Sequence, residues 1–343
     1  MSSPLRVGFL GAGLIATFHS KVLRASGVEV ERVGVWDPDR GRAEGFVAAA
    51  GGFVADGEDQ VLDGCDAVYV CTWTSEHPRL VSAAVARGLA VFCEKPLAVD
   101  LATATRLADE VVAAGVTNQV GLVLRRSPAF NLVRALIADE AAGPVMAAVF
   151  RDDQFIPIQG HYGSTWRGDV AKAGAGTFLE HSIHDVDLVE HLLGPVTSVS
   201  ARSAHVHDLP GIEDSVSALL ELASGATVTL TSVWHDVLAR PSLRRLEVLC
   251  RDRWIAVEDD WTGPVTWQDP TGEPTTLSGA ELLAECERRG IATPNPDGDF
   301  VTAAAAGAPA WPDVTVALRA HRLVDAVYRS AASGGSPVAT VLG

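Results

Sequence analysis

The stretch Val7 to Ala16, with the sequence VGFLGAGLIA, decides the fold of this chain. Its first four residues predict a short buried strand, and a helical pattern through Leu23 follows the glycine turn. In such a turn the first glycine makes the bend, the second lets a pyrophosphate approach the backbone, and a small third residue allows close packing. Unpaired N–H groups at the start of the helix also favour an anion. We therefore expect this turn to bind a dinucleotide, through Gly11, Gly13, Leu14 and Ile15.

A carboxylate follows the next apolar run, Val33 to Trp36, at Asp37. It lies about 20 residues beyond the glycine turn, where the dinucleotide fingerprint expects an acidic residue. A carboxylate there accepts hydrogen bonds from the adenosine ribose and repels a 2′-phosphate, which favours NAD over NADP. Arg40 and Arg42 keep NADP open as the less favoured cofactor. The alternative for Asp37 is a helix N-cap before Pro38.

The pattern up to residue 122 alternates short apolar runs with helical segments. Strands are expected at 67–71, 89–93 and 118–122, and helices at 78–87 and 101–114. This alternation predicts a parallel sheet covered on both faces, a Rossmann-type NAD-binding domain over residues 1–122. Ligands of such sheets bind outside the carboxyl ends of the strands. The segments after two of the strands, Thr72-Trp73-Thr74 and Glu94-Lys95-Pro96, should therefore face the same crevice as the glycine turn.

Lysine is rare in this chain, which has it only at positions 21, 95 and 172 against 24 arginines. Lys95 stands at the end of an apolar run and directly before Pro96. Proline fixes its own φ and biases the preceding residue toward extended geometry. The direction in which the Lys95 side chain leaves the backbone is therefore restricted. We expect Lys95 to lie near the nicotinamide. A solvated strand end is the alternative interpretation of these residues.

Residues 123–343 show a different pattern and predict a second domain of α+β type. A helix is expected at about 128–139, before long runs typical of strands. Several of these runs alternate apolar and polar residues, which indicates a large, mostly antiparallel open sheet with one face solvated or covered by a partner. Such a face favours a homo-oligomer, a dimer or tetramer. The expected strands are 145–150, 196–205, 215–222, 226–234, 243–249 and 253–257.

The segment 173–193 predicts one helix ended by Gly194-Pro195. At 100° per residue, four polar side chains fall within a wedge of about 60°. A plain amphipathic helix with a wet edge explains the same pattern. A metal bound by residues at i and i+4 is a further alternative, but no third ligand is evident nearby, so we expect no metal. The four residues are Glu180, His184, Asp187 and His191.

Bulk properties restrict the class of protein. The chain has 343 residues, of which 48% are hydrophobic, which is enough for two domains with separate cores. Its net charge of −16 argues against nucleic-acid and anionic-membrane partners. Five cysteines without a CxxC pair indicate reduced thiols. With no leader-like start and no long apolar run, we expect a cytoplasmic protein with a small-molecule substrate.

These motifs together resemble the Gfo/Idh/MocA family of oxidoreductases over nearly the whole chain. The resemblance implies a catalytic lysine and histidine, here Lys95 and His184. It also places Glu180 where aspartate is usual and Ser182 where glycine is usual. The matching features are the glycine turn with Ala16, His19, Asp37, the Glu94-Lys95-Pro96 triplet, Trp166-Arg167, the helix carrying His184 and the segment 323–330.

The resemblance further implies hydride transfer between NAD and a secondary alcohol of a sugar, sugar derivative or cyclitol. His184 is the expected general base, Lys95 the group that stabilises charge on the oxygen, and Glu180 the residue that orients His184 or grips a hydroxyl. Expected cofactor contacts include Thr72, Thr74, His77, Glu94, Lys95, Trp166 and Arg167. Expected substrate contacts from the second domain are Gln154, His161, Tyr162, Arg167, Lys172, Trp234 and His235.

Four points stay open at this stage. The family motif Thr-Pro-Asn-x-x-His is Thr72-Trp73-Thr74-Ser75-Glu76-His77 here, so Trp73 replaces the proline near the nicotinamide. Salt bridges explain Arg167 and Lys172 as well as substrate contacts do. Some relatives oxidise a sugar carbon only transiently, which enables glycosidic cleavage or elimination without net redox change. Others bind the dinucleotide as regulators without turnover, a role that retention of Lys95 and His184 disfavours.

Overall fold

The computed structural model describes residues 3–160 and 162–340, which form two compact units. The first unit comprises the chain up to Val123 together with Pro294–Leu318, and the second comprises Leu124–Thr293 and the chain from Arg319 onward. The sequence predicts a single boundary, between residues 122 and 123. The structure differs because the chain leaves the second unit at residue 294 and returns to pack within the first.

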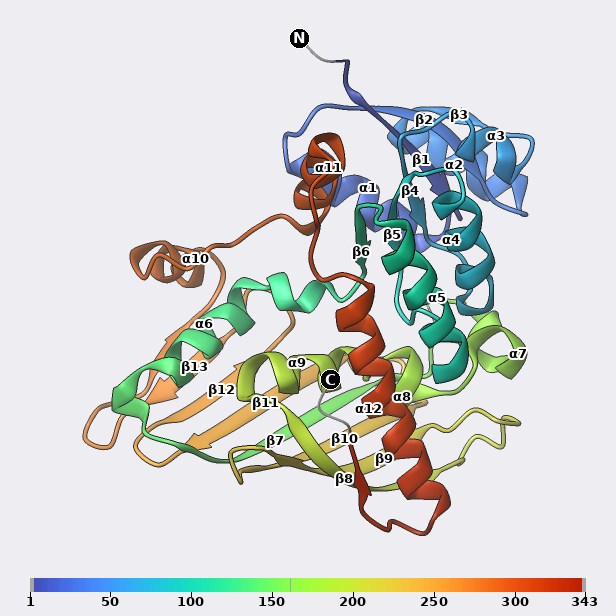
Figure 1. Cartoon of the computed structure of the whole chain (residues 1–343). Coiled ribbons are helices and arrows are strands. Elements are labelled where there is room, and N and C mark those ends of the chain that lie inside the picture. The colour runs from blue at the N-terminus through green and yellow to red at the C-terminus, as the bar shows by residue number, and fades with distance from the viewer. Residues whose placement is uncertain (1–2, 161, 341–343) are drawn as a thin grey trace. The chain divides into compact units, whose positions relative to one another are not determined.

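The first unit contains a parallel sheet, as the sequence predicted (Figure 1). Within the described residues, six strands take the order β3-β2-β1-β4-β5-β6, and every neighbouring pair is parallel. The last strand is two residues shorter than expected, and β3 was not expected. The strands are β1 (Leu5–Leu10), β2 (Val30–Trp36), β3 (Phe53–Val54), β4 (Ala67–Val70), β5 (Ala90–Cys93) and β6 (Asn118–Val120).

Helices cover both faces of this sheet. On one face, buried residues of α1, α2 and α11 join the strands in a common core. On the other face, α3 packs so closely on β1 and β2 that a Cβ at Gly8 or Gly34 would meet Val61. The helices are α1 (Leu14–Ala25), α2 (Arg40–Ala50), α3 (Glu58–Leu62), α4 (His77–Val85), α5 (Leu101–Ala114) and α11 (Pro296–Ala306).

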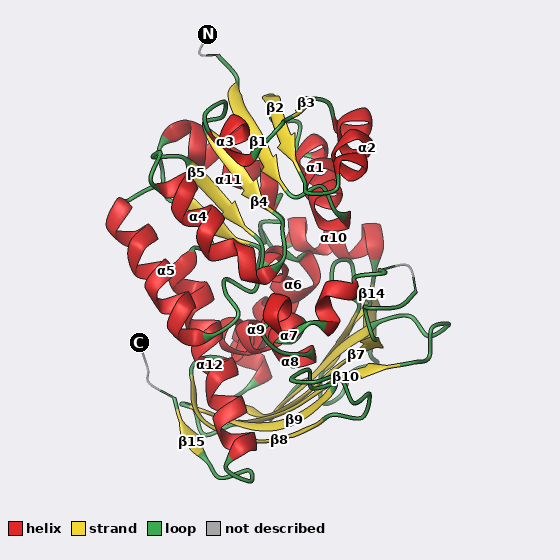
Figure 2. Ribbon diagram, turned by 90° about the vertical axis from the view of Figure 1, so that its right-hand side faces the viewer, coloured by secondary structure: helices red, strands yellow, loops and turns green. Residues whose placement is uncertain are grey.

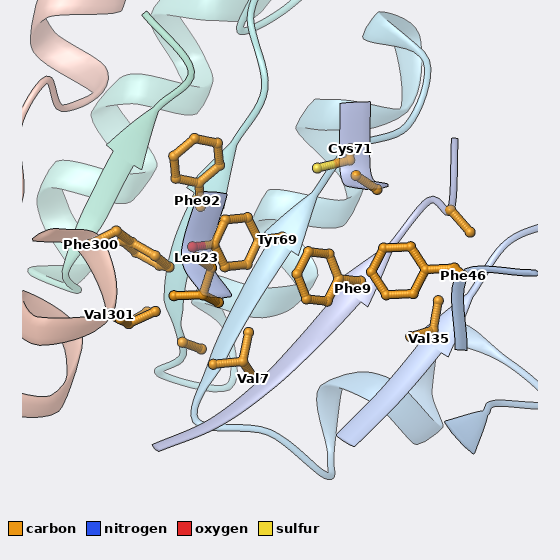
Figure 3. Packing of buried hydrophobic residues seen from close by; sticks show 14 of the residues in the cluster. Val7, Phe9, Leu23, Val35, Phe46, Tyr69, Cys71, Phe92, Phe300 and Val301 are labelled. Carbon is orange, nitrogen blue, oxygen red and sulfur yellow. The ribbon is translucent and has the colours of Figure 1, made fainter. Parts of the chain in front are cut away.

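A row of aromatic rings forms the centre of the first core (Figure 3). Phe9, Tyr69 and Phe92 are paired across β1, β4 and β5, and their rings stack at centroid distances of 4.7 and 4.8 Å. Phe300 of α11 meets Tyr69 and Phe92 edge-on, at 5.4 and 5.6 Å. Edge-to-face contacts of this kind stabilise beyond the area that they bury. The returning segment is therefore part of this core.

The second unit is built on a nine-stranded sheet of order β14-β13-β12-β11-β7-β10-β9-β8-β15 within the described residues. The pairs are antiparallel except β7 and β10, which are parallel. The prediction of a mostly antiparallel sheet is confirmed. The strands are β7 (Val145–Phe155), β8 (Val196–Ala204), β9 (Ser215–Leu222), β10 (Thr227–His235), β11 (Leu243–Cys250), β12 (Trp254–Glu258), β13 (Val265–Gln268), β14 (Thr275–Leu277) and β15 (Val338–Ala339).

One face of the nine-stranded sheet carries the helices of this unit, and the described residues place no helix on the other (Figure 2). Burial alternates along β9 and β10 accordingly, with apolar side chains turned toward the helices. The open face still exposes Val149, Leu219 and Leu249. The helices of this unit are α6 (Pro128–Ala138), α7 (Val170–Ala173), α8 (Thr177–Glu180), α9 (Ile183–Leu193), α10 (Gly279–Arg288) and the part of α12 (Val314–Ala332) from Arg319 onward.

All five cysteines are free and buried, as expected for reduced thiols. Across residues 3–160 and 162–340, none of the helices combines the length and the apolar character needed to cross a bilayer.

We predict that Phe300→Ala lowers the free energy of unfolding by about 3–5 kcal/mol, because it removes a fully buried ring and leaves a cavity. Urea denaturation followed by tryptophan fluorescence measures this. The control is Thr302→Ala on the exposed side of the same helix, which should stay within about 0.5 kcal/mol of the wild type. Equal, small losses for both variants would show that the returning segment is not part of the first core.

Candidate functional site

The glycine turn has the geometry of a dinucleotide cradle. Gly11 has φ +91°, and a Cβ there would collide with the backbone carbonyl of Cys71. A Cβ at Gly13, the N-cap of α1, would meet nothing within 4 Å. The space beside the helix N-terminus is therefore open, and Leu14 exposes 65% of its surface next to it. Backbone N–H groups at such an end fit a pyrophosphate.

Asp37 lies against this turn. Its Oδ2 accepts a hydrogen bond from the Ala12 N–H at 2.8 Å, and its Oδ1 accepts one from the Asp39 N–H at 2.8 Å. The alternative interpretation of Asp37 as the helix N-cap is wrong, because Asp39 caps α2 through the N–H groups of Gly41 and Arg42. Asp37 is thus available at the end of β2 for a ribose.

Arg40 and Arg42, which kept NADP open as an alternative cofactor, are both paired with carboxylates of the first unit. Arg40 Nε donates to Glu44 at 3.1 Å, and Arg42 Nε lies 3.6 Å from Asp39. Both pairs are exposed on α2, where an ion pair contributes little stability. They nevertheless give each guanidinium a partner within its own helix or cap, which agrees with NAD as the favoured cofactor.

The segments after β4 and β5 are joined by one buried histidine. His77 Nε2 lies 3.2 Å from the Thr72 carbonyl oxygen, and its Nδ1 lies 2.7 Å from that of Pro96. Thr74 is buried in the same loop. The first unit therefore gathers the glycine turn, Asp37, the Thr72 loop and the Glu94-Lys95-Pro96 triplet at the carboxyl ends of neighbouring strands, where such sheets bind ligands.

Glu94 and Lys95 follow β5 with different environments. Glu94 is only 6% exposed, and its Oε2 accepts a hydrogen bond from the Lys95 N–H at 3.2 Å. Burial alone would raise the pKa of Glu94, but the hydrogen bond and charge of His19 outweigh it and hold the pKa below its usual value. Lys95 is half-buried. The carboxylate thus supports the backbone from which the lysine side chain leaves.

The expected single helix over 173–193 is wrong. The chain forms α8, breaks at His181 and Ser182, and starts α9 at Ile183. Ser182 is buried, with its Oγ 2.6 Å from Ser232 Oγ and 3.3 Å from Asp152 Oδ2. These contacts to two strands of the sheet fix the hydroxyl at the break. Glu180 therefore does not share a continuous helical face with His184.

The remaining members of the expected wedge are structural. Asp187 forms a buried, bidentate pair with Arg125, with N–O distances of 2.7 and 2.6 Å. Burial nevertheless raises the pKa of Asp187 to about 6. Burial also lowers the pKa of His191 to about 4, with nearby arginines adding to the effect. His184, half-buried at the start of α9, is the histidine of this helix that stays a catalytic candidate.

Glu180 is buried at the end of α8 and accepts a hydrogen bond from Arg167 Nε at 3.1 Å. The Arg167 guanidinium also stacks over the Trp166 ring, 4.5 Å from its centre. The structure thus brings together three residues that the sequence analysis had assigned separately to cofactor and substrate. Lys172 lies 3.6 Å from Asp169, which agrees with the salt-bridge interpretation.

Two residues that the sequence analysis missed hold the turn that carries Glu180. Glu213 accepts hydrogen bonds from the Gly176 and Phe178 N–H groups at 2.7 and 2.9 Å, which satisfies the start of α8. The Tyr328 hydroxyl donates to Glu213 at 2.8 Å and accepts from the Leu179 N–H at 3.0 Å. Nothing in the local sequence links these residues, which are brought together by folding.

A buried charge network lies next to His184 in the chain. Arg244, 6% exposed, donates to Asp185 at 2.6 Å, to Asp152 at 3.0 Å and to Asp260 at 2.6 Å. Burial raises the pKa of Asp185 to about 7, against the opposing charge of Arg244. Alternation along β11 was the signal for Arg244, because it shares a face with Leu246 and Val248, which are buried.

The other expected substrate residues lie close together in the second unit, where β7 and β10 end and pair Gln154 with Trp234 and Phe155 with His235. Tyr162 stacks on Phe155 at 5.2 Å, His235 Nε2 lies 3.6 Å from Asp153, and Gln154 is buried. Trp234 is a packing residue of a small core with Ile156. His161 lies outside the described residues. Among the described residues, no group of three or more His, Cys, Asp or Glu side chains could hold a metal ion.

Comparison with known proteins agrees with this arrangement. Residues 5–122 match the family model described as an oxidoreductase family with an NAD-binding Rossmann fold. Residues 130–256 match the GFO/IDH/MocA C-terminal domain. An inositol 2-dehydrogenase of Rhizobium meliloti is 30% identical over 338 residues, which cover 96% of this chain and 97% of the relative. The chain belongs to the Gfo/Idh/MocA family of oxidoreductases. NAD is the cofactor of this family fold, and the cradle described above fits it.

Two further proteins are similar to this member of the Gfo/Idh/MocA family. A 1,5-anhydro-D-fructose reductase of Ensifer adhaerens is 32% identical over 237 residues, covering 67% of this chain and 68% of the relative. The solved structure of an inositol dehydrogenase homologue from Azotobacter vinelandii, complexed with NAD+, is 20% identical. Its TM-score is 0.84, and the match covers 99% of this chain and 98% of that one. The latter likeness shows the fold.

We predict that Asp37→Ala lowers the preference for NAD over NADP by about tenfold or more, because it removes charged acceptors for the ribose and repulsion of a 2′-phosphate. Fluorescence titration with NADH and NADPH measures both affinities. The control is Asp109→Ala, which removes the same charge at an exposed position of α5 and should leave cofactor preference unchanged. Unchanged selectivity of Asp37→Ala would contradict the ribose assignment.

We predict that Arg244→Ala lowers the free energy of unfolding by about 3–5 kcal/mol at pH 8, because two buried aspartates lose their counter-ion. The loss should shrink toward pH 5, since protonation of Asp185, whose pKa is already raised, removes the uncompensated charge. Urea denaturation at both pH values measures this. Half-buried Arg245, paired with Glu247 and Glu258, is the control, and Arg245→Ala should cost about 1 kcal/mol or less.

Proposed function

We propose that this protein transfers a hydride between NAD and a secondary alcohol of a sugar, sugar derivative or cyclitol. The observation that carries the proposal is the cluster at the carboxyl edge of the six-stranded sheet. There Asp37 is bonded to the glycine turn, and His77 joins the Thr72 loop to the Lys95 triplet. The cluster provides a dinucleotide cradle and a presented lysine on one rigid edge. The names of the inositol and anhydrofructose relatives support the substrate class.

In this proposal His184 takes the hydroxyl proton as general base, a role that suits a histidine near neutral pH. Lys95 hydrogen-bonds the same oxygen and stabilises the negative charge that grows on it as the C–H bond breaks. The nicotinamide supplies the hydride chemistry when bound. Running the steps in reverse, with His184 donating the proton, reduces the ketone.

Glu180 is a positioning residue in this proposal. Its carboxylate is buried beside Arg167, and its turn is held by Glu213 and Tyr328. Held in this position, the carboxylate hydrogen-bonds a substrate hydroxyl or orients His184. Trp166 and Arg167 extend this polar patch toward the substituents of the substrate. Gln154, Tyr162, Lys172 and His235 are further substrate contacts in the same proposal.

We also propose that the protein is a cytoplasmic homo-oligomer, a dimer or tetramer formed through the open face of the nine-stranded sheet. Val149 pairs with Thr229 of β10, and Thr229 pairs with Leu219 of β9, so exposed apolar side chains share a row across neighbouring strands. A surface of this kind is a common interface between copies. Arg151, paired with Asp153, adds a polar rim.

We predict that Lys95→Ala and His184→Ala each lower kcat by about two to four orders of magnitude, because each removes proton transfer or charge stabilisation in the transition state. The assay follows NADH formation with a panel of sugars, inositols and glycosides. NADH binding should be retained in both variants. Lys21→Ala and His205→Ala alter exposed residues of the same types and should leave turnover unchanged.

Other outcomes identify other functions. Loss of NADH binding in Lys95→Ala would make this lysine a phosphate contact. Product formation by the wild type without accumulation of NADH would indicate transient oxidation. Normal cofactor binding with no turnover of any compound in the panel would favour a regulator.

A further inference from the structure

His19 is a buried histidine of α1 whose two ring nitrogens both face carboxylates. It is 1% exposed. Its Nε2 lies 2.8 Å from Glu94 Oε1, and its Nδ1 lies 2.9 Å from Asp297 Oδ1. The three residues come from α1, the segment after β5 and the returning helix α11, and all belong to the first unit. One imidazole ring therefore joins three segments that are far apart in the sequence.

The two contacts determine the protonation state of the ring. An ionised carboxylate only accepts hydrogen bonds, so two such partners require an N–H on both ring nitrogens. Burial by itself would lower the pKa of His19, but Asp297 and Glu94 outweigh it and raise the pKa to about 10. A neutral ring would leave one of two buried carboxylates without a donor, which is costly. His19 is thus an imidazolium at neutral pH.

The other titratable groups near the ring do not compensate for its charge. Burial is the main cause that raises the pKa of Tyr69, Cys71 and Cys93 above their usual values, so these groups stay neutral. Against the effect of burial, Lys95 and His77 act with His19 to lower the pKa of Glu94. Glu94 is also closely enclosed, since a Cβ at Gly121 would collide with its Oε1. The carboxylate has little room to turn away from His19.

We propose that His19 is a positioning residue for the lysine triplet: its imidazolium ties Glu94 to the anchor Asp297 and thereby fixes the backbone that presents Lys95. The link to the lysine is the hydrogen bond from the Lys95 N–H to Glu94 Oε2, at 3.2 Å. The consequence for catalysis rests on the function proposed above for Lys95. The structural part of the inference is independent of it.

The structural part can be tested without turnover, because the chain has only three lysines. Protein labelled with ¹⁵N-lysine gives three backbone amide signals, and Lys95→Arg assigns one of them. In the wild type, the Lys95 signal should stay constant from about pH 6 to pH 8.5, because His19 remains protonated. Lys172, in the second unit, is an internal reference.

The deciding variant is Asp297→Asn, which keeps the side-chain volume and an acceptor oxygen but removes the charge. The pKa of His19 should fall toward its ordinary value of about 6.5, so the Lys95 amide signal should now shift with pH within the window. Asp109→Asn, an exposed position on α5, makes the same change elsewhere in the first unit and should leave the signal constant.

His19→Gln gives a second arm that does not depend on the folding of Asp297→Asn. Glutamine supplies a neutral donor toward Glu94 and lacks the second ring nitrogen. The Lys95 amide should be displaced at every pH, without a titration step. Both arms report on the backbone of Lys95 and need no substrate.

Kinetics test the catalytic consequence. In Asp297→Asn, kcat should fall by about tenfold as pH rises through the lowered pKa of His19, because the ring then loses its positive charge and binds Glu94 less strongly. KM and NADH affinity should change by less than about twofold, since no binding group is removed. If His19 only stabilised the fold, Asp297→Asn would lower the free energy of unfolding and kcat would show no such dependence on pH.

Two results would overturn the inference: a wild-type Lys95 amide that itself titrates near pH 6.5, or one that is unmoved by both Asp297→Asn and His19→Gln. A protein that shows the expected amide behaviour yet oxidises no sugar or cyclitol would overturn the proposed function alone. The two failures are therefore distinguishable.

Discussion

The buried contact of His19 with two carboxylates is the constraint on which the first unit depends. A parallel sheet leaves the segments after its strands free to vary, since their hydrogen bonds lie outside the sheet. Here the segment after β5 is bonded to α1 and α11 through one charged ring. The aromatic row of Phe9, Tyr69 and Phe92 ends next to that ring, because the ring centroids of His19 and Phe92 lie 4.7 Å apart. Charge and packing thus fix the same edge of the sheet.

The second unit uses buried charge for the same purpose at a different place. Arg244 bonds to Asp185 in the first turn of α9, and Glu213 with Tyr328 bonds to the start of α8, so buried charge lies on both sides of the short turn between these helices. Replacing buried ion pairs by well-packed apolar residues is often neutral for stability, so a gain in stability does not explain why these pairs are present. Their directional hydrogen bonds explain it, because a two-residue break between helices has few backbone hydrogen bonds of its own and needs fixed partners.

Much of this fold could be predicted because its signals are local. The glycine turn, the carboxylate at Asp37 and the alternation of strand and helix are read within windows of a few residues. The break at Ser182 could not, because residues 177–193 have a helical pattern throughout, and the partners of Ser182 lie 30 and 50 residues away in sequence. The same holds for the return of α11, whose Phe300 and Asp297 find their partners near residues 19, 69 and 92.

The two departures from the family pattern, Ser182 for glycine and Glu180 for aspartate, both acquire a physical role at this break. Asp152 and Ser232 are directly paired across β7 and β10, and the Ser182 hydroxyl lies against both, so it anchors the start of α9 to the sheet. A glycine would lack that anchor. At the other side of the break, the longer side chain of Glu180 meets Arg167, which stacks on Trp166. An aspartate would hold its carboxylate about one bond closer to the backbone, and the 3.1 Å contact with Arg167 would lengthen. The serine therefore fixes the start of α9, next to His184, and the longer glutamate places its carboxylate beside Arg167.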